Sequence, residues 1–215
     1  TQSNITNWQT AKFWQNAGAK RVILARELSF NEISEIREKC PDLELEIFVH
    51  GAMCISYSGR CLISAYFNNR HANLGECTHP CRWKYSVMEE SRPGQYFPVE
   101  QDNSGTYLFN SKDLCLWKDL DKIYKAGIDS IKIEGRMKSN YYVANVVRTY
   151  RKTIEALKNN SQIKEEWFEE LFKVSHRTYS EGFFNGFDSM ITQNYESSSY
   201  NRNWQYLGNI EKIED

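Results

Sequence analysis

Helix and strand patterns alternate along most of this chain, and that alternation limits the fold more than any other feature. Short apolar runs typical of strands occupy residues 21–26, 45–50 and 130–134. Helical patterns lie before, between and after them, at residues 8–17, 29–39, 113–126 and 139–158. A strand, a helix and a further strand in succession make a parallel βαβ unit. The sequence therefore predicts an α/β fold built on a parallel sheet.

Local signals mark the ends of these helices. Ser29 and Glu32 form a capping box at the start of the second helix. Gly127 ends the third helix, and Ser139 caps the fourth. Apolar residues recur at helical spacing in the fourth helix, at Val143, Val146, Val147, Tyr150, Ile154 and Leu157. We expect these positions to form its buried face.

Three parallel strands are too few for a domain whose sheet is covered on both faces. We therefore expect residues 1–158 to be the C-terminal part of a TIM-like (β/α) barrel whose first strands lie outside this chain. This part includes a long cysteine-bearing loop at residues 51–106. A helical and linker segment follows at residues 159–204. Residues 205–215 are expected to begin a further small module, with a strand at residues 206–210.

Four of the six cysteines fall in the long loop, in two close pairs. Cys54 and Cys61 are separated by six residues, and Cys77 and Cys81 by three. Thiolates that converge from one loop suit an iron–sulfur cluster, and they also suit zinc. The sequence therefore predicts one metal centre. The length of the loop and the arginines around it favour an iron–sulfur cluster over zinc.

Alternatives remain open for the ligands. Cys115 is a second choice for the fourth ligand in place of Cys81, because no cysteine lies between them. His71 and His79 would allow a zinc site made of three cysteines and one histidine. Outside this role, Cys40 and Cys115 are expected to be ordinary, partly buried thiols of a reducing cytoplasm.

Charge and hydropathy exclude several protein classes. The formal net charge is −1, so the chain as a whole carries no signal for nucleic acid. It has no run of about 18 apolar residues and no secretory signal pattern, so we expect a cytoplasmic protein without a membrane span. Basic residues gather between residues 132 and 152, at Lys132, Arg136, Lys138, Arg148, Arg151 and Lys152, against the one acid Glu134. This cluster suits phosphates or carboxylates, and a solvated helix face is an equal alternative.

Residues 46–64 resemble the signature of the collagenase-like peptidase family U32. The agreement includes Cys54 and Cys61 and the glycines Gly51 and Gly59. Further segments that resemble the family are residues 1–7, 24–27, 75–82, 110–114, 132–136 and 175–177. Within the family, the chain looks most like the branch that makes 5-hydroxyuridine at the wobble position of tRNA.

The resemblance implies an enzyme that hydroxylates uridine in tRNA with a 4Fe–4S cluster. The implied ligands are Cys54, Cys61, Cys77 and Cys81, and the implied hydroxyl donor is prephenate. The family also leaves room for a partner subunit from the same family, and for hydroxylation of ubiquinone or ribosomal RNA. Proteolysis is a further alternative, although the chain has no Ser–His–Asp arrangement, zinc-protease motif or aspartic dyad. The last alternative function is a structural module that binds zinc.

Strand ends are expected to supply the remaining site residues, because functional groups of such barrels follow the C-terminal ends of the strands. Prephenate carries two carboxylates and needs fixed cations, a role that we assign to Arg26, Arg60, Arg82, Lys132 and Arg136. Proton transfer is assigned to Glu27, His50 and Glu134, which are expected to point at the same mouth. Phosphate contacts are expected from Lys84, Lys138, Arg148 and Arg151, and base stacking from Trp83 and Tyr85. For each site residue, a rim salt bridge or simple packing is the alternative.

Overall fold

A computed structural model of the protein describes residues 2–54, 56–83, 86–88, 90–91, 93–94, 96–98, 111–186, 201 and 203–208. The helices are α1 (Trp8–Asn16), α2 (Phe30–Lys39), α3 (Ile63–Asn68), α4 (Leu120–Lys125), α5 (Asn140–Lys158) and α6 (Glu165–Glu170). Short 3-10 turns lie at Ala72–Leu74, Pro80–Arg82, Trp117–Asp119 and Leu171–Lys173. The strands are β1 (Arg21–Ile23), β2 (Glu44–Ala52), β3 (Ser86–Met88), β4 (Tyr96–Pro98), β5 (Asp113–Cys115), β6 (Ser130–Glu134) and β7 (Tyr179–Ser180).

Strand β2 is the centre of the main sheet. It pairs in parallel with both β1 and β6. Glu46 has Ile23 of β1 as one partner and Ser130 of β6 as the other, so the two neighbours lie on opposite edges of β2. The parallel sheet predicted from the alternation of helices and strands is confirmed.

The end of β2 pairs with a strand that the sequence does not predict. Strand β5 runs antiparallel to β2, with Cys115 opposite His50, and β7 adds in parallel to β5. The prediction of a helix from residue 113 is therefore wrong, because residues 113–115 satisfy a free edge of β2 and α4 begins only at Leu120. Within the described ranges the main sheet is mixed and open. The α/β class is confirmed, and the TIM-like barrel is not.

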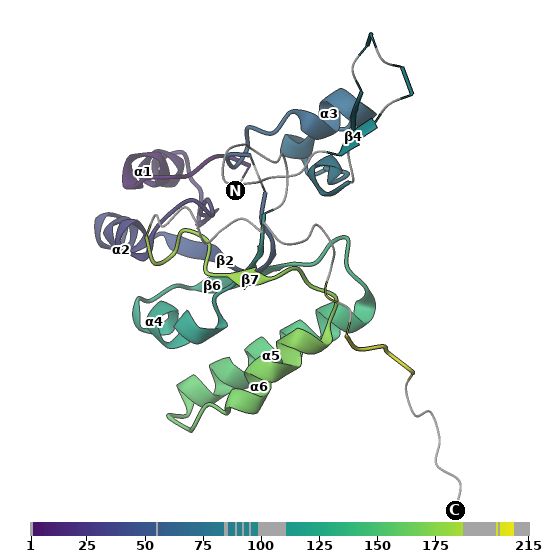
Figure 1. The fold of residues 1–215 in the computed structure, drawn as a ribbon. Helices are drawn as coiled ribbons and strands as arrows, with labels where there is room; N and C mark the ends of the chain where they lie inside the picture. Colours follow the sequence, from purple (N-terminus) through teal and green to yellow (C-terminus); the bar gives the residue numbers. More distant parts are fainter. Residues whose placement is uncertain are drawn as a thin grey trace, which may run out of the picture.

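Helix caps agree with the sequence. Ser29 and Glu32 form the capping box of α2, with the Ser29 backbone N–H donating to Glu32 Oε2 at 2.7 Å. Ser139 Oγ accepts the Tyr142 backbone N–H at the start of α5. Figure 1 shows α5 and α6 side by side below the sheet, and α3 above it near β4. In this view, helices α3 and α5 therefore lie on opposite sides of the sheet.

The buried face of α5 differs in part from the prediction. Val143 and Val147 are 39% and 44% exposed, so the prediction is wrong for these two. The other four predicted positions are buried or half-buried: Val146, Tyr150, Ile154 and Leu157. Thr153 is buried in addition, and its Oγ1 accepts a hydrogen bond from Trp117 Nε1 at 2.8 Å. Because the Thr153 hydroxyl has a hydrogen-bond partner in the core, its burial costs little free energy. The buried face of α5 therefore includes Thr153.

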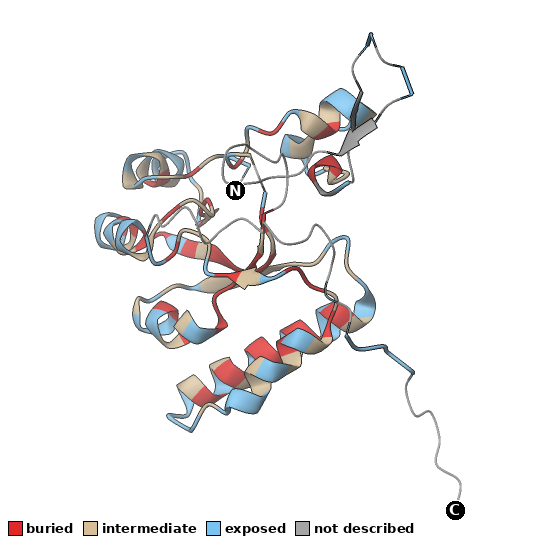
Figure 2. Cartoon of the chain, in the orientation of Figure 1, coloured by how far each residue is buried: buried red, intermediate tan, exposed pale blue. Residues whose placement is uncertain are grey.

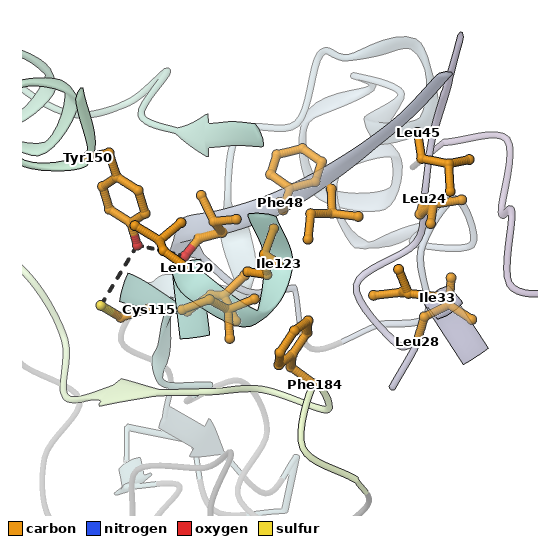
Figure 3. Packing of buried hydrophobic residues seen from close by; sticks show 14 of the residues in the cluster. Leu24, Leu28, Ile33, Leu45, Phe48, Cys115, Leu120, Ile123, Tyr150 and Phe184 are labelled. Carbon is orange, nitrogen blue, oxygen red and sulfur yellow. Dashed lines mark hydrogen bonds between the residues drawn. The ribbon is translucent and has the colours of Figure 1, made fainter. Parts of the chain in front are cut away.

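One hydrophobic core joins segments from residues 5–53 and 114–184. Figure 2 shows buried residues concentrated in the sheet and on the helix surfaces that face it. In Figure 3, Leu45 of β2 lies near Leu24, and Phe184, from the turn that follows β7, lies near Ile123. The same view shows Tyr150, which donates to the Val49 carbonyl at 3.0 Å. Cys40 and Cys115 are both buried, more deeply than predicted.

The C-terminal prediction is tested only in part. Residues 203–208 have no regular secondary structure, so the strand predicted at residues 206–210 is absent from its described part, residues 206–208. Residues 187–200, 202 and 209–215 lie outside the described residues. Among the helices that the structure describes, none has the length and hydropathy needed to cross a bilayer.

Two glycines allow close approaches of the backbone. Gly51 has a φ of +108°, and a Cβ there would lie 2.1 Å from the backbone oxygen of Glu134. Gly59 has a φ of +74°, and a Cβ there would lie 2.3 Å from the backbone oxygen of Gln2. Only glycine fits at such positions. The first contact joins β2 to the end of β6, and the second joins the long loop to the start of the chain.

We expect Gly51→Ala to destabilise the protein more than Gly18→Ala does. Gly18 has a φ of +97° with open space around a Cβ. Alanine there therefore costs only the free energy of holding an L-residue at positive φ, about 1–2 kcal/mol. Alanine at position 51 adds an overlap with Glu134, about 1–3 kcal/mol more. Urea unfolding of the two variants measures the difference. Equal losses would contradict the role given to the close approach.

His50 lies in the core. Its Nδ1 is 3.3 Å from the Tyr150 hydroxyl, and its ring lies beside those of Tyr142 and Tyr179. Its Nε2 has no hydrogen-bond partner among the residues described. Burial lowers the pKa of His50 to about 3, against a smaller opposing effect of Asp113. The imidazole is therefore neutral at neutral pH.

The free energy of unfolding should fall as the pH falls below 6.5. The unfolded chain protonates His50 with its ordinary pKa of 6.5, and the folded protein does so only near pH 3, so acid favours unfolding between these values. One group contributes at most about 1.4 kcal/mol per pH unit. Burial lowers the pKa of His176 as well, so its contribution has the same sign. Denaturant unfolding of wild type, His50→Gln and His176→Gln between pH 6.5 and pH 3 separates the contributions of the two histidines. An unchanged pH slope in His50→Gln would sink the prediction.

Candidate functional site

Four cysteines of the long loop line one cavity at the C-terminal ends of β2 and β6. Cys54, Cys61, Cys77 and Cys81 all contribute to its wall, and its volume is about 140 Å³. Cys54 follows β2, Cys61 precedes α3, and the other two lie in a turn at residues 75–81, here called the cysteine turn. The loop therefore brings the four thiols to a common space, the cysteine cavity.

The thiol of Cys54 is neutral at neutral pH. Although Cys54 is open to solvent on one side, the protein packed around its thiol raises its pKa to about 11. A backbone hydrogen bond from Ser56 and the charge of Arg26 lower this pKa, whereas Cys61 and Cys81 raise it. A metal bound here would therefore displace a proton from Cys54.

The cysteine turn directs a backbone N–H at a sulfur. His79 has a φ of +58°, a left-handed conformation that is uncommon for residues other than glycine. Its backbone N–H donates to the Cys77 sulfur at 3.3 Å. Hydrogen bonds to ligand sulfurs stabilise their negative charge and tune the potential of a bound cluster. The conformation of His79 therefore places a hydrogen-bond donor beside the Cys77 sulfur.

Two arginines and a glutamate line the same cavity. Arg26 Nη2 lies 3.9 Å from Glu134 Oε2, and its guanidinium lies 4.0 Å from the centre of the Phe48 ring. The Arg136 backbone N–H donates to Glu134 Oε1 at 3.0 Å. The cavity thus presents two cations and one carboxylate beside the thiols.

Arg136 also holds the cysteine turn. Its two terminal nitrogens donate to the backbone carbonyls of Gly75 and Cys77. A planar guanidinium can serve two acceptors at once, which a lysine ammonium does less well. Because Arg136 follows β6, these bonds fasten the cysteine turn to the end of the sheet. Two donors of a side chain assigned to substrate binding are therefore engaged with the protein itself.

Neither His50 nor Lys132 is among the described residues that line the cavity. The expectation that His50 points at the same mouth as the strand-end carboxylates is wrong. The pairing of β2 with β6 shifts register between Phe48 and His50, and such a bulge re-aims the side chains around it. Lys132 Nζ lies 3.4 Å from Glu46 Oε1 and 5.4 Å from the centre of the Phe48 ring.

The remaining predicted residues have different places. Glu27 Oε1 accepts the Ser58 backbone N–H at 2.6 Å, and Ser58 lines the cavity. Glu27 therefore stabilises a residue of the cavity wall and does not line the cavity itself. Arg60 is exposed beside the wall residue Cys61. The side chain of Arg82 lies outside the described residues.

The predicted phosphate contacts do not form one surface. Lys138 Nζ lies 3.5 Å from the buried carboxylate of Asp113. Arg148 and Arg151 are exposed along α5. Lys84 and Tyr85, predicted to contact phosphate and to stack on a base, lie outside the described residues. The basic cluster of the sequence is therefore divided between a buried ion pair, the cysteine turn and a helix surface.

Residues that the sequence did not single out also line the cavity, among them Gln2, Tyr57 and Asn73. Gln2 and Tyr57 lie inside segments that resemble the family, residues 1–7 and 46–64, and those segments were the available signal. Nothing local to Asn73 indicates a site. Its place follows from the path of the loop between α3 and the cysteine turn.

The donor set suits an iron–sulfur cluster or zinc in number and kind. Three of the thiols with His79, which also lines the cavity, would suit zinc, whereas His71 is exposed outside the wall. No group of three His, Cys, Asp or Glu side chains in the described part of the chain is arranged to hold a metal ion as it stands. Ligation would require the thiols to turn toward one another. Cys115 lies in the core against Tyr150, and burial raises its pKa to about 11, which disfavours it as a ligand.

We expect Arg136→Lys to loosen the cysteine turn. A lysine cannot hold the carbonyls of Gly75 and Cys77 together, and losing one or two hydrogen bonds should raise deuterium uptake about fivefold or more at residues 75–81. Hydrogen exchange followed by mass spectrometry measures this uptake. Arg148→Lys, on the exposed surface of α5, is the control and should leave it unchanged. Equal uptake in both variants would mean that Arg136 does not hold the turn.

Comparisons with known proteins place this site in a family. A sequence model described as peptidase family U32 matches residues 1–194. The tRNA hydroxylation protein P of Escherichia coli is 41% identical over 234 residues, which cover 91% of this chain and 52% of that protein. The tRNA hydroxylation protein P1 of Bacillus subtilis is 40% identical over 211 residues, 97% of this chain and 50% of that protein. A protein named collagenase from Porphyromonas gingivalis is 33% identical over 199 residues, 86% of this chain and 47% of that protein.

The chain spans about half the length of the curated relatives it matches. No solved structure is significantly similar to it. The family match nevertheless extends from the first residue through every segment that lines the cysteine cavity. The chain belongs to peptidase family U32.

Proposed function

We propose that this chain is part of an enzyme that hydroxylates uridine in tRNA to 5-hydroxyuridine. The observation that carries the proposal is the cavity in which four thiols meet two arginines, a set suited to redox chemistry on an anionic co-substrate. Relatives that are 41% and 40% identical are named for tRNA hydroxylation. Replacing the C5–H of uridine by C5–OH removes two electrons from the base. The donor of the hydroxyl group must accept those electrons.

The proposed cofactor is a 4Fe–4S cluster held by Cys54, Cys61, Cys77 and Cys81. When bound, such a cluster supplies the one-electron chemistry that amino-acid side chains lack. The N–H of His79 stabilises charge on Cys77, and the charge of Arg26 does the same for Cys54. Zinc is the alternative occupant of the same thiols.

Prephenate is the proposed hydroxyl donor. Its two carboxylates need cations, and Arg26 and Arg136 are the arginines whose side chains line the described cavity wall. A guanidinium carries five N–H donors, so each arginine can hold a carboxylate while it keeps its protein contacts. Glu134 lies between the two arginines, and we assign proton transfer to it.

Proteolysis is the second function to be tested, because one relative is named collagenase. A cysteine protease needs a thiolate nucleophile. Burial raises the pKa of Cys54 to about 11, which works against that role. A protease with one cysteine nucleophile would also not need the other three cysteines that line the cavity.

Cys54→Ala in the full-length protein should abolish hydroxylation by removing a cluster ligand. The measurements are the 5-hydroxyuridine content of tRNA in cells that lack their own enzyme, and the bound iron and visible absorbance of anaerobically purified protein. Cys40→Ala is the matched control, because Cys40 is a buried thiol outside the cavity. This control should keep both iron and activity nearly intact.

Three outcomes would contradict the proposal. Equal hydroxylation by Cys54→Ala and wild type would leave the thiols a structural role. A colourless protein that contains zinc and still hydroxylates tRNA would exclude the cluster. Peptide cleavage by purified protein, without hydroxylation, would favour the protease.

A further inference from the structure

Three solvent-exposed aromatic side chains lie on α3 and in the segment that packs against it, close to the cysteine cavity. Tyr66 is 84% exposed, Phe67 49% and Trp83 47%. The rings of Tyr66 and Phe67 lie 5.2 Å apart between centroids, and those of Phe67 and Trp83 lie 6.2 Å apart. These three side chains, here called the aromatic platform, form a continuous exposed group. Exposed aromatic groups of this kind mark binding surfaces.

The platform is attached rigidly to the cysteine turn. Thr78 donates its backbone N–H to Ser64 Oγ at 3.1 Å, and Asn68 Nδ2 donates to Thr78 Oγ1 at 2.8 Å. Ser64 and Asn68 belong to α3, and Ser64 is fully buried. Thr78 stands between Cys77 and His79, which both line the cavity. The distance between platform and cavity is therefore set by the fold.

Arginines precede and follow α3 in the sequence. Arg60 and Arg70 are exposed, and neither takes part in an ion pair with another described residue. Glu76 is the single acid between residues 57 and 83, a segment that holds three arginines in a chain whose net charge is −1. This local excess of cations is complementary to a polyanion.

We infer that the aromatic platform and its two arginines bind the unpaired loop of an RNA and present one base to the cysteine cavity. Unpaired bases stack on exposed aromatic rings, and arginines hold the phosphates between them. Tyr57 is exposed and also lines the cavity, so it offers a further ring to a base that enters there. This inference rests on the proposed function and adds to it the surface that receives the RNA.

A folded protein partner is the competing occupant, either the remainder of the longer protein or a second subunit. The cores of protein–protein interfaces are depleted in charge. Here two exposed arginines without ion-pair partners in the described chain precede and follow α3, which favours the nucleic acid.

The test is binding of a labelled RNA stem–loop with uridine in its loop to the full-length protein. Tyr66→Ala should weaken binding about tenfold or more, because each stacked base contributes that much. It should leave binding of the fully paired duplex unchanged. Arg70→Gln should weaken binding and reduce the salt dependence by about one phosphate contact. Both side chains are exposed, so the variants should unfold at the wild-type temperature.

The matched controls are Tyr124→Ala and Lys20→Gln. Tyr124 is an exposed tyrosine on α4, and Lys20 is an exposed cation that precedes β1, at the end of the sheet opposite the cavity. Neither control should change binding of the stem–loop. Hydroxyl-radical footprinting should show Tyr66 and Trp83 protected only when RNA is present.

Two results would overturn the inference while leaving the proposed function intact. The first is wild-type affinity and hydroxylation in Tyr66→Ala and Arg70→Gln. The second is protection of Tyr66 in the full-length protein without RNA, which would mean that another part of the protein covers the platform. Absence of both RNA binding and hydroxylation in the wild-type protein would instead remove the proposed function, and the inference with it.

Discussion

The pairing of β2 on both of its edges is the constraint on which the rest of the structure depends. Strand β6 approaches β2 so closely that a Cβ at Gly51 would lie 2.1 Å from the Glu134 backbone oxygen. This contact brings the end of β6, with Glu134 and Arg136, beside the end of β2, which leads directly to Cys54. The close backbone contact between Gly51 and Glu134 holds the ends of β2 and β6 together, and the cavity forms at these ends. The same contact sets the positions of Glu134 and Arg136 in the cavity wall.

The cysteine turn is fixed from two sides before any cofactor is bound. Arg136 holds it to the sheet through the carbonyls of Gly75 and Cys77, and Thr78 holds it to α3 through Ser64. A site that is ordered in advance loses less conformational entropy when its ligand binds. The same two attachments place the aromatic platform at a set distance from the thiols. The cysteine cavity and the aromatic platform are in this sense one structural unit.

A buried carboxylate contributes to two failed predictions, the helix from residue 113 and the phosphate contact of Lys138. Asp113 is fully buried, accepts the Arg177 backbone N–H at 3.1 Å, and lies 3.5 Å from Lys138 Nζ. A buried carboxylate is tolerated only with such partners. These partners come from segments far apart in the chain, so an aspartate that reads locally as a helix start lies instead in a strand. Lys138, expected to contact phosphate, is used in the same ion pair.

By itself, the sequence determined the alternation of strands and helices, the helix caps at Ser29 and Ser139, and the grouping of four cysteines in one loop. These are local signals, carried by residues a few positions apart, and hydrophobic periodicity and capping chemistry are enough to read them. It also marked Gly51 and Gly59 through family resemblance, without the contacts that require them.

Only the tertiary structure decided that residues 113–115 form a strand, that His50 faces the tyrosines of the core, and that Gln2 reaches the cavity. Each of these depends on a partner that is distant in the chain: a free strand edge, a bulge between β2 and β6, or a backbone contact at Gly59. Local propensity carries no information about such partners, because their free energy arises only when the segments meet.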